Sequence, residues 1–104
     1  MRSRNIFDSL LEIKKTGKKA ALATIIRTKG STPRKTGSKM LIIEDGKLIG
    51  TIGGGCGEAE VIEIAIEVIC KQQPAQHQVD LTKGLFYEDG GICGGIMDVF
   101  IEPI

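Results

Sequence analysis

The residue best suited to chemistry is Cys56, which follows three glycines in the run GGGCG and directly precedes a helix-like segment. A thiol at a helix N-terminus favours its thiolate form, because the helix dipole and free backbone N–H groups stabilise the anion. A thiolate binds soft metals and attacks sulfur. Glycine backbones can also turn several N–H groups toward one anion, so the run is a candidate phosphate cradle. The alternative is a tight strand-to-helix turn that needs positive φ and a small residue at position 56.

Two further cysteines receive different interpretations. Cys93 lies in a second glycine loop, GGICGG, and could face the same pocket as Cys56, or the two could be unrelated. Cys70 lies late in the helical segment beside Val68 and Ile69, and is predicted to belong to the core. No Cys-x-x-Cys pair or zinc-type spacing occurs. The odd cysteine count indicates free thiols in a reducing compartment, so a cytoplasmic location is expected.

Glu58 lies at the start of the same helix. Helical periodicity sets it opposite a solvent-facing stripe, so its carboxylate is predicted to point toward the protein or into a site. The stripe consists of Glu60, Glu63, Glu67 and Lys71. A carboxylate at this position can cap the N–H groups of its own helix, or it can interact with a ligand.

The segment GSTPRKTGSK (residues 30–39) supplies the matching cations. Arg34 can hold a phosphate through two hydrogen bonds, whereas Lys35 and Lys39 would add positive field only. The alternative is an exposed basic turn. His77 is expected to be a surface strand residue rather than a ligand.

The elements that must position these residues can be predicted from periodicity and turn signals. We expect a helix over 5–16, strands over 20–28, 39–43 and 47–52, a helix over 58–72, and strands over 78–82 and 96–102. The Asp45-Gly46 pair indicates a tight hairpin between the second and third strands. This order predicts an α+β fold: one small domain over 1–104, with a mixed, mainly antiparallel sheet of about five strands packed with two helices.

Composition narrows the function classes. The 104 residues are 41% hydrophobic and 26% charged, which is typical of a globular domain, and no apolar run reaches membrane-spanning length. Aromatic residues are 4% without Trp, which argues against a stacking platform for nucleic acid. The net charge of +1 divides into +9 over residues 1–39 and −8 over 40–104, so the basic part can steer an anionic ligand. The lysines at 14, 15, 18 and 19 are predicted to be a solvated helix end.

Three blocks together resemble the XdhC/CoxI family, accessory proteins of molybdenum hydroxylases such as xanthine dehydrogenase and aerobic carbon monoxide dehydrogenase. The blocks are GSTPRKTG (30–37) followed by Lys39-Met40, GTIGGGC (50–56) with Glu58, and Cys93-Gly94-Gly95 before a strand that ends in Ile-Glu-Pro. Longer members of the family continue into a Rossmann-like second domain that has no counterpart in residues 1–104. Gly57 and Ser38 stand where the family pattern leads us to expect a small apolar residue and an alanine.

The resemblance implies a chaperone that binds the molybdenum cofactor (molybdopterin) transiently, helps its sulfuration and passes it to the apoenzyme. It implies that Cys56 contacts the metal end of the cofactor and that Cys93 is a second thiol. The implied set of cofactor-binding residues is Ser31, Pro33, Arg34, Gly53, Gly54, Gly55, Cys56, Glu58, Cys93, Gly94 and Gly95. It also implies that no residue is catalytic, because the chemistry would be holding rather than turnover.

The implied partners are a molybdenum hydroxylase apoenzyme, a cysteine desulfurase, a separate Rossmann-domain chain and a second copy of the chain, with no nucleic acid or membrane. Two other functions stay open. The first is a thiol sulfurtransferase or redox enzyme that uses Cys56 and Cys93. The second is an assembly protein that binds no ligand.

Overall fold

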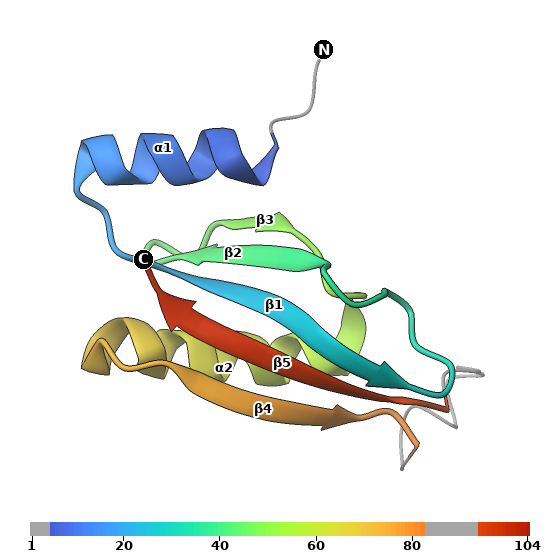
Figure 1. Ribbon diagram of the computed structural model, residues 1–104. Helices are drawn as coiled ribbons and strands as arrows, with labels where there is room; N and C mark the ends of the chain where they lie inside the picture. The colour runs from blue at the N-terminus through green and yellow to red at the C-terminus, as the bar shows by residue number, and fades with distance from the viewer. Residues whose placement is uncertain (1–4, 83–93) are drawn as a thin grey trace.

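The computed structural model describes residues 5–82 and 94–104, and it confirms the α+β fold (Figure 1). Two helices and five strands follow in the predicted order. They are α1 (Ile6–Thr16), β1 (Ala20–Lys29), β2 (Lys39–Ile43), β3 (Leu48–Gly50), α2 (Gly55–Lys71), β4 (Ala75–Asp80) and β5 (Ile96–Pro103).

The strands form one antiparallel sheet in the order β3-β2-β1-β5-β4. The predicted hairpin joins β2 to β3: Gly46 has φ +94°, and Asp45 accepts a hydrogen bond from the Lys47 amide at 3.0 Å. The longest pairing joins β5, the last strand along the chain, to β1, and it contains a bulge between Ile25 and Arg27. The first and last strands of the chain therefore meet in the centre of the sheet.

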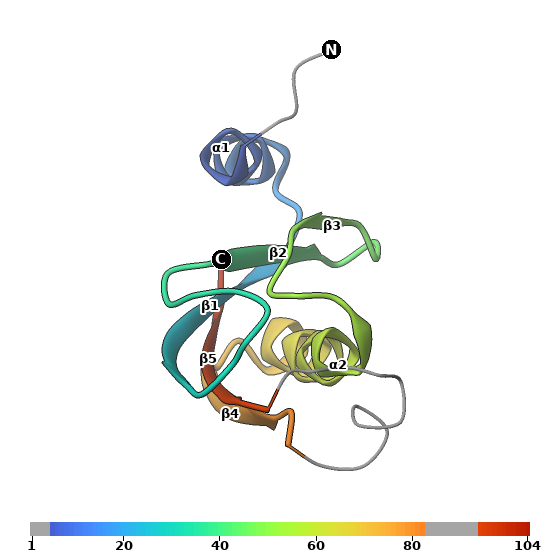
Figure 2. The ribbon, with the colours of Figure 1, turned by 90° about the vertical axis from the view of Figure 1, so that its right-hand side faces the viewer.

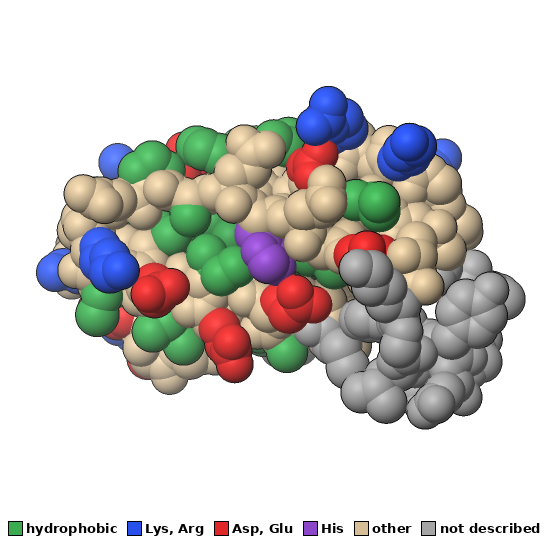
Figure 3. Space-filling view, turned by 90° about the horizontal axis from the view of Figure 1, so that it is seen from below, with side chains coloured by type: hydrophobic (Ala, Val, Ile, Leu, Met, Phe, Trp, Pro, Cys, Tyr) green, Lys and Arg blue, Asp and Glu red, His purple; other side chains and the backbone are tan. Residues whose placement is uncertain are grey.

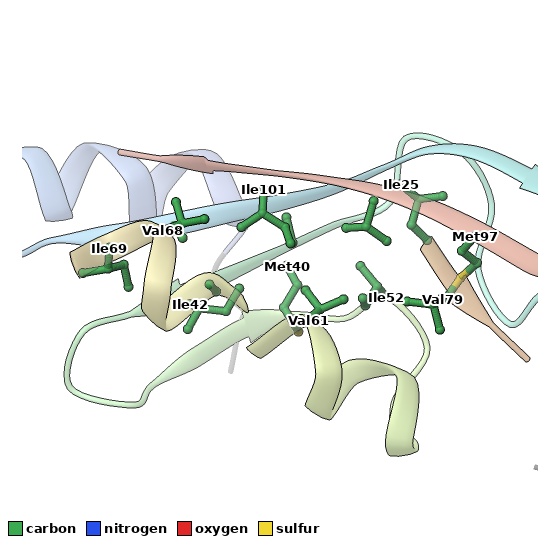
Figure 4. Packing of buried hydrophobic residues seen from close by; sticks show 14 of the residues in the cluster. Ile25, Met40, Ile42, Ile52, Val61, Val68, Ile69, Val79, Met97 and Ile101 are labelled. Atoms are coloured by element: carbon green, nitrogen blue, oxygen red, sulfur yellow. The ribbon is translucent and has the colours of Figure 1, made fainter. Parts of the chain in front are cut away.

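Helix α2 covers one face of the sheet and forms the main core (Figure 4). Val61 and Val68 of the helix pack against Ile25, Met40 and Ile101 of the three central strands, and all five side chains are buried. Helix α1 lies on the opposite face, beside β2 and β3 (Figure 2), where Ile13 packs in a smaller cluster that includes Leu41 and Ile43. The sheet therefore separates two apolar clusters of unequal size.

Both ends of α1 are capped. Asn5 caps the helix by accepting a hydrogen bond from the Asp8 amide at 2.9 Å, and Gly17 ends it with φ +77°. The lysines at 14, 15, 18 and 19 are exposed, as expected of a solvated helix end. Among the described residues, neither helix has the length and apolar character required to cross a membrane.

In three elements a boundary differs from the prediction by two residues or more. Helix α2 begins at Gly55 rather than residue 58, so Cys56 and Gly57 are already helical. Strand β3 ends at Gly50 rather than 52, because Gly50 has φ +82°. Strand β4 spans 75–80 rather than 78–82, since an edge strand accepts the polar residues of its first half.

The prediction that Cys70 belongs to the core is wrong. The side chain is exposed, on the outer face of α2 with Ile66, which is 56% exposed. The buried face of the helix runs instead through Ala65, Val68 and Ile69. The solvent-facing surface of α2 is therefore wider than the stripe of charged residues suggested.

Candidate glycine-loop binding site

Three described segments that are distant in sequence meet at one end of the sheet: the basic loop, the glycine turn before α2, and Gly94-Gly95 before β5. A Cβ atom on Gly53 would lie 2.4 Å from Cγ of Pro33, so these residues pack in direct contact. A Cβ atom on Gly95 would lie 2.5 Å from the backbone oxygen of Ser31, and one on Gly30 would lie 3.1 Å from Cα of Gly95. A residue with a side chain at position 53 or 95 would therefore push these segments apart.

The turn into α2 has the backbone that the glycine run predicts. Gly53, Gly54 and Gly55 have φ values of +131°, +74° and +71°, which side-chain-bearing residues rarely adopt. A Cβ on Gly54 or Gly55 would have no other atom within 4 Å. The backbone at these two positions is therefore open to a ligand.

Glu58 organises this turn through one carboxylate oxygen. Its Oε2 accepts hydrogen bonds from Oγ1 of Thr51 at 2.7 Å, from the amide of Gly54 at 2.9 Å and from the amide of Ile52 at 3.3 Å. The hydroxyl of Thr51 in turn accepts from the amide of Gly53 at 3.0 Å. These amides belong to the turn before α2 and not to the helix itself, so Glu58 holds the turn and does not cap the N–H groups of its own helix.

Thr51 is a residue of this site that the sequence interpretation missed. The familiar capping signature places the hydroxyl three residues before the carboxylate, whereas seven residues separate Thr51 from Glu58. The available signal was a hydroxyl residue near the end of a predicted strand, two residues before a glycine run.

The basic loop closes through its own hydrogen bonds and presents its cations to solvent. Thr32 Oγ1 donates to the backbone oxygen of Arg34 at 2.9 Å, and Arg34 Nη1 donates to that of Pro33 at 2.9 Å. Arg34 and Lys35 are exposed. An open depression beside the loop is lined by Thr28, Gly30, Ser31, Thr32, Lys35 and Thr36. The depression therefore offers hydroxyl groups and an ammonium group to a ligand.

Two predicted site residues cannot be placed. Cys93 and the side chain of Cys56 lie outside the described part of the structure. Whether the two sulfurs share a pocket, and whether the Cys56 sulfur faces Arg34, stays a prediction. The backbone of Cys56 belongs to the first turn of α2. Within residues 5–82 and 94–104, no cluster of three histidine, cysteine or acidic side chains could hold a metal ion.

His77 lies apart from this site, as expected of a surface strand residue. Its Nε2 lies 3.0 Å from Oε1 of Glu60, so the pair joins β4 to α2. Figure 3 shows the histidine among acidic and hydrophobic side chains on the face formed by these elements.

The described residues at this end of the sheet fit an anionic ligand. Gly54, Gly55 and Gly94 have open space where a side chain would be. The exposed cations of residues 34 and 35 lie in the loop that Pro33 anchors against Gly53. A ligand at this end of the sheet would therefore meet backbone and cations together.

The chain matches a known protein family, and it is similar in sequence and in structure to individual proteins. The family model of the XdhC and CoxI family matches residues 13–80. The chain is 35% identical to the uncharacterized protein YqeB of Escherichia coli K12 over 94% of its length, and 34% identical to a probable xanthine dehydrogenase subunit of Bacillus subtilis over 95%. It is 35% identical to the molybdenum cofactor insertion chaperone PaoD of E. coli K12 over 64%.

A crystal structure of a xanthine dehydrogenase from Bacillus halodurans superposes with a TM-score of 0.77 at 33% identity, covering 92% of this chain and 29% of the other. The chain spans 18% of the length of YqeB, 30% of the B. subtilis protein and 21% of PaoD. The matched residues include the basic loop and the glycine turn. The chain belongs to the XdhC and CoxI family.

Proposed function

We propose that this domain binds the molybdenum cofactor during maturation of a molybdenum hydroxylase such as xanthine dehydrogenase, holding it while it is sulfurated and inserted. The observation that carries the proposal is the packing of Pro33 on Gly53 and of Gly95 on Ser31, which unites the three motif blocks at one end of the sheet. The chaperone PaoD among the relatives supports this assignment.

The roles of the residues follow from their chemistry. Arg34 and Ser31 would bind the anionic end of the cofactor, since a guanidinium and a hydroxyl both donate to phosphate oxygens. Gly53, Gly54, Gly55, Gly94 and Gly95 would allow the cofactor to approach the backbone. Cys56, with Cys93 as a second thiol, would contact the metal end, because molybdenum is a good acceptor for thiolate sulfur. When bound, the cofactor supplies the metal and its sulfur ligand; the chain supplies the cradle.

Glu58 has a different role in this proposal. Its Oε2 is engaged by three donors of the turn, so we assign it as a positioning residue rather than a ligand of the cofactor. It holds Gly54 in the conformation that keeps the turn open.

The proposed partners are the apoenzyme of the hydroxylase and a cysteine desulfurase, in the cytoplasm. We further propose that residues 1–104 act as one domain, and that a Rossmann-domain chain or a second copy completes the cofactor site. The open depression and the exposed turn support this, because a single domain leaves one side of the ligand uncovered.

The test is co-elution of the chain with molybdenum cofactor released from a donor enzyme. Wild type should retain the cofactor, Cys56→Ala and Arg34→Gln should each retain at least about fivefold less, and Lys71→Gln should behave like wild type. Lys71 is a matched control because it removes one charge at the far end of α2. Absence of cofactor in the wild-type peak would overturn the function, and equal retention by Cys56→Ala would remove that thiol from it.

A further inference from the structure

The face of the sheet that points away from α2 carries a polar network across three neighbouring strands. Asp98 of β5 is paired in register with Arg27 of β1 and with Gln78 of β4. Arg27 Nε donates to Oδ2 of Asp98 at 2.8 Å, and Gln78 Nε2 donates to Oδ1 at 3.1 Å. The Asp98 side chain is only 8% exposed, so the network is built into the sheet.

The guanidinium of Arg27 is held at its Nε atom, whereas its two Nη groups face solvent. Its side chain is 74% exposed, although its Nε is held by Asp98. Within residues 5–82 and 94–104, its two Nη groups are paired with no protein acceptor. A guanidinium held this way presents its remaining N–H groups in a fixed fork, and the entropy cost of ordering the side chain is already met.

The surroundings of this guanidinium form a concavity. It is lined by Arg27, Thr28, Lys29, Gln78, Ile96 and Asp98. Lys29 lies two residues from Arg27 on the same strand, so both cations face one side of the sheet. Helix α1 leaves this part of the sheet uncovered, because it packs beside β2 and β3 (Figure 1).

The concavity adjoins the candidate site. Thr28 lines both it and the depression formed by Ser31, Thr32 and Lys35. The two hollows therefore share this residue at the end of β1.

Two carboxylates oppose an anion here, and they differ in position. Both oxygens of Asp98 are engaged by Arg27 and Gln78. Asp80 is paired with Ile96 on the same side of the sheet and accepts from the Thr82 amide at 2.9 Å. Asp98 therefore positions the guanidinium of Arg27, whereas Asp80 makes the electrostatic potential at the concavity more negative and so opposes an anion.

We propose that Arg27, with Lys29, forms an oxyanion subsite that is contiguous with the candidate cofactor site. It would take a second phosphate group of a ligand whose first anionic group lies at Ser31 and Arg34. The identity of that ligand rests on the proposed function, whereas the subsite itself does not.

The test is titration with inorganic phosphate, followed by amide chemical shifts of Thr28, Lys29 and Gln78. Arg27→Gln should weaken phosphate binding by about tenfold and Arg27→Lys by about threefold, since lysine keeps the charge and loses the fork. Lys71→Gln is the control for general charge loss and should change the affinity by less than about twofold.

Two substitutions that each remove one negative charge test whether Asp98 acts by positioning Arg27 or only through its charge. Asp80→Asn should tighten phosphate binding, because it removes a negative charge. Asp98→Asn also removes a negative charge, yet it should weaken binding. Its single oxygen can accept from Arg27 Nε or from Gln78 Nε2 but not from both, and a neutral amide holds the guanidinium less firmly than a carboxylate. Thermal unfolding and dispersed amide spectra establish that each variant is folded. If Asp98→Asn does not fold, Arg27→Lys against Arg27→Gln carries the test.

Equal phosphate affinity in wild type and Arg27→Gln would overturn the subsite, and so would tighter binding by folded Asp98→Asn. Phosphate binding that depends on Arg27, in a chain that retains no cofactor, would support the subsite and reject the proposed function. The two proposals can therefore fail separately.

Discussion

At the scale of the residue, the carboxylate of Glu58 accepts the hydrogen bonds that backbone N–H groups of the glycine turn would otherwise donate to a ligand or to water. The bare N–H groups of such a turn are costly to leave unpaired, and Oε2 satisfies those of Ile52 and Gly54. The sequence predicted that Glu58 points inward, and the structure agrees. It could not predict Thr51 as the third donor, because that contact depends on how sharply the chain turns after Gly50.

Removing this carboxylate should destabilise the fold. Glu58→Ala leaves three donors without their acceptor and should cost about 2 kcal/mol, whereas Thr51→Val, which removes one hydrogen bond, should cost about 1 kcal/mol. Urea unfolding measures both. Glu63→Ala is the matched control on the exposed face of the same helix and should stay within about 0.5 kcal/mol of wild type. Equal effects of Glu58→Ala and Glu63→Ala would show that the turn does not depend on this contact.

Asp98 makes a second residue-scale contribution, which depends on pH. Its hydrogen bonds with Arg27, and then with Gln78, lower the pKa of its carboxyl below the usual value. A group whose pKa is lower in the folded state adds stability above its unfolded pKa of about 3.9, and that stability is lost as the pH falls through the folded value.

Urea unfolding between pH 7 and pH 2.5 checks this sign. Wild type should lose stability on acidification below about pH 4 more steeply than Asp98→Asn, which has no proton to bind at this position. Above pH 5 the difference between the two proteins should be constant. Parallel acid profiles of wild type and Asp98→Asn would contradict the assignment.

At the scale of the element, Gly57 explains how closely α2 approaches the edge of the sheet. A glycine inside a helix lowers its stability, and the sequence alone gives no compensating reason. In the structure, a Cβ at this position would lie 2.9 Å from Cγ1 of Val79 on β4. The first turn of α2 therefore packs its backbone against a strand, and this contact needs glycine.

A double-mutant cycle tests this packing. Gly57→Ala gains up to about 1 kcal/mol of helix propensity but overfills the contact at a cost of about 1–3 kcal/mol, so the net effect should be destabilising. Combined with Val79→Ala, which makes room, the same alanine should become neutral or stabilising. The coupling energy should be about 1–2 kcal/mol. A coupling energy near zero would place the effect in the helix alone.

The elements also show what periodicity can and cannot predict. The hairpin at Asp45-Gly46, the two helices and the buried strands were correct because each has a local signal. The exposure of Cys70 was not predictable, because the apolar residues of α2 surround much of the helix and only the sheet decides which of them are covered. The bulge after Ile25, which turns Arg27 toward Asp98, also depends on pairing with β5.

At the scale of the whole molecule, the sheet divides the protein into two cores of different strength. The larger cluster joins α2 to β1, β2, β4 and β5, whereas the smaller cluster holds α1 to β1, β2 and β3. Phe7 and Leu11 of α1 are 67% and 62% exposed and add nothing to it. The candidate site lies at the end of the larger core. Its loops are therefore anchored to the part of the molecule that should open last.

Native-state hydrogen exchange should reveal this division. Amides of α1 should exchange through a local opening with a lower free energy than amides of β1, β5 and α2, which should require global unfolding. Ile13→Ala should lower protection in α1 and leave α2 nearly unchanged, because Ile13 belongs to the smaller cluster only. Val61→Ala should lower protection throughout, because it removes a fully buried side chain of the larger core. If amides of α1 and β1 exchange with the same opening free energy, the two clusters unfold as one unit. The loops of the site would then be no more resistant to opening than α1.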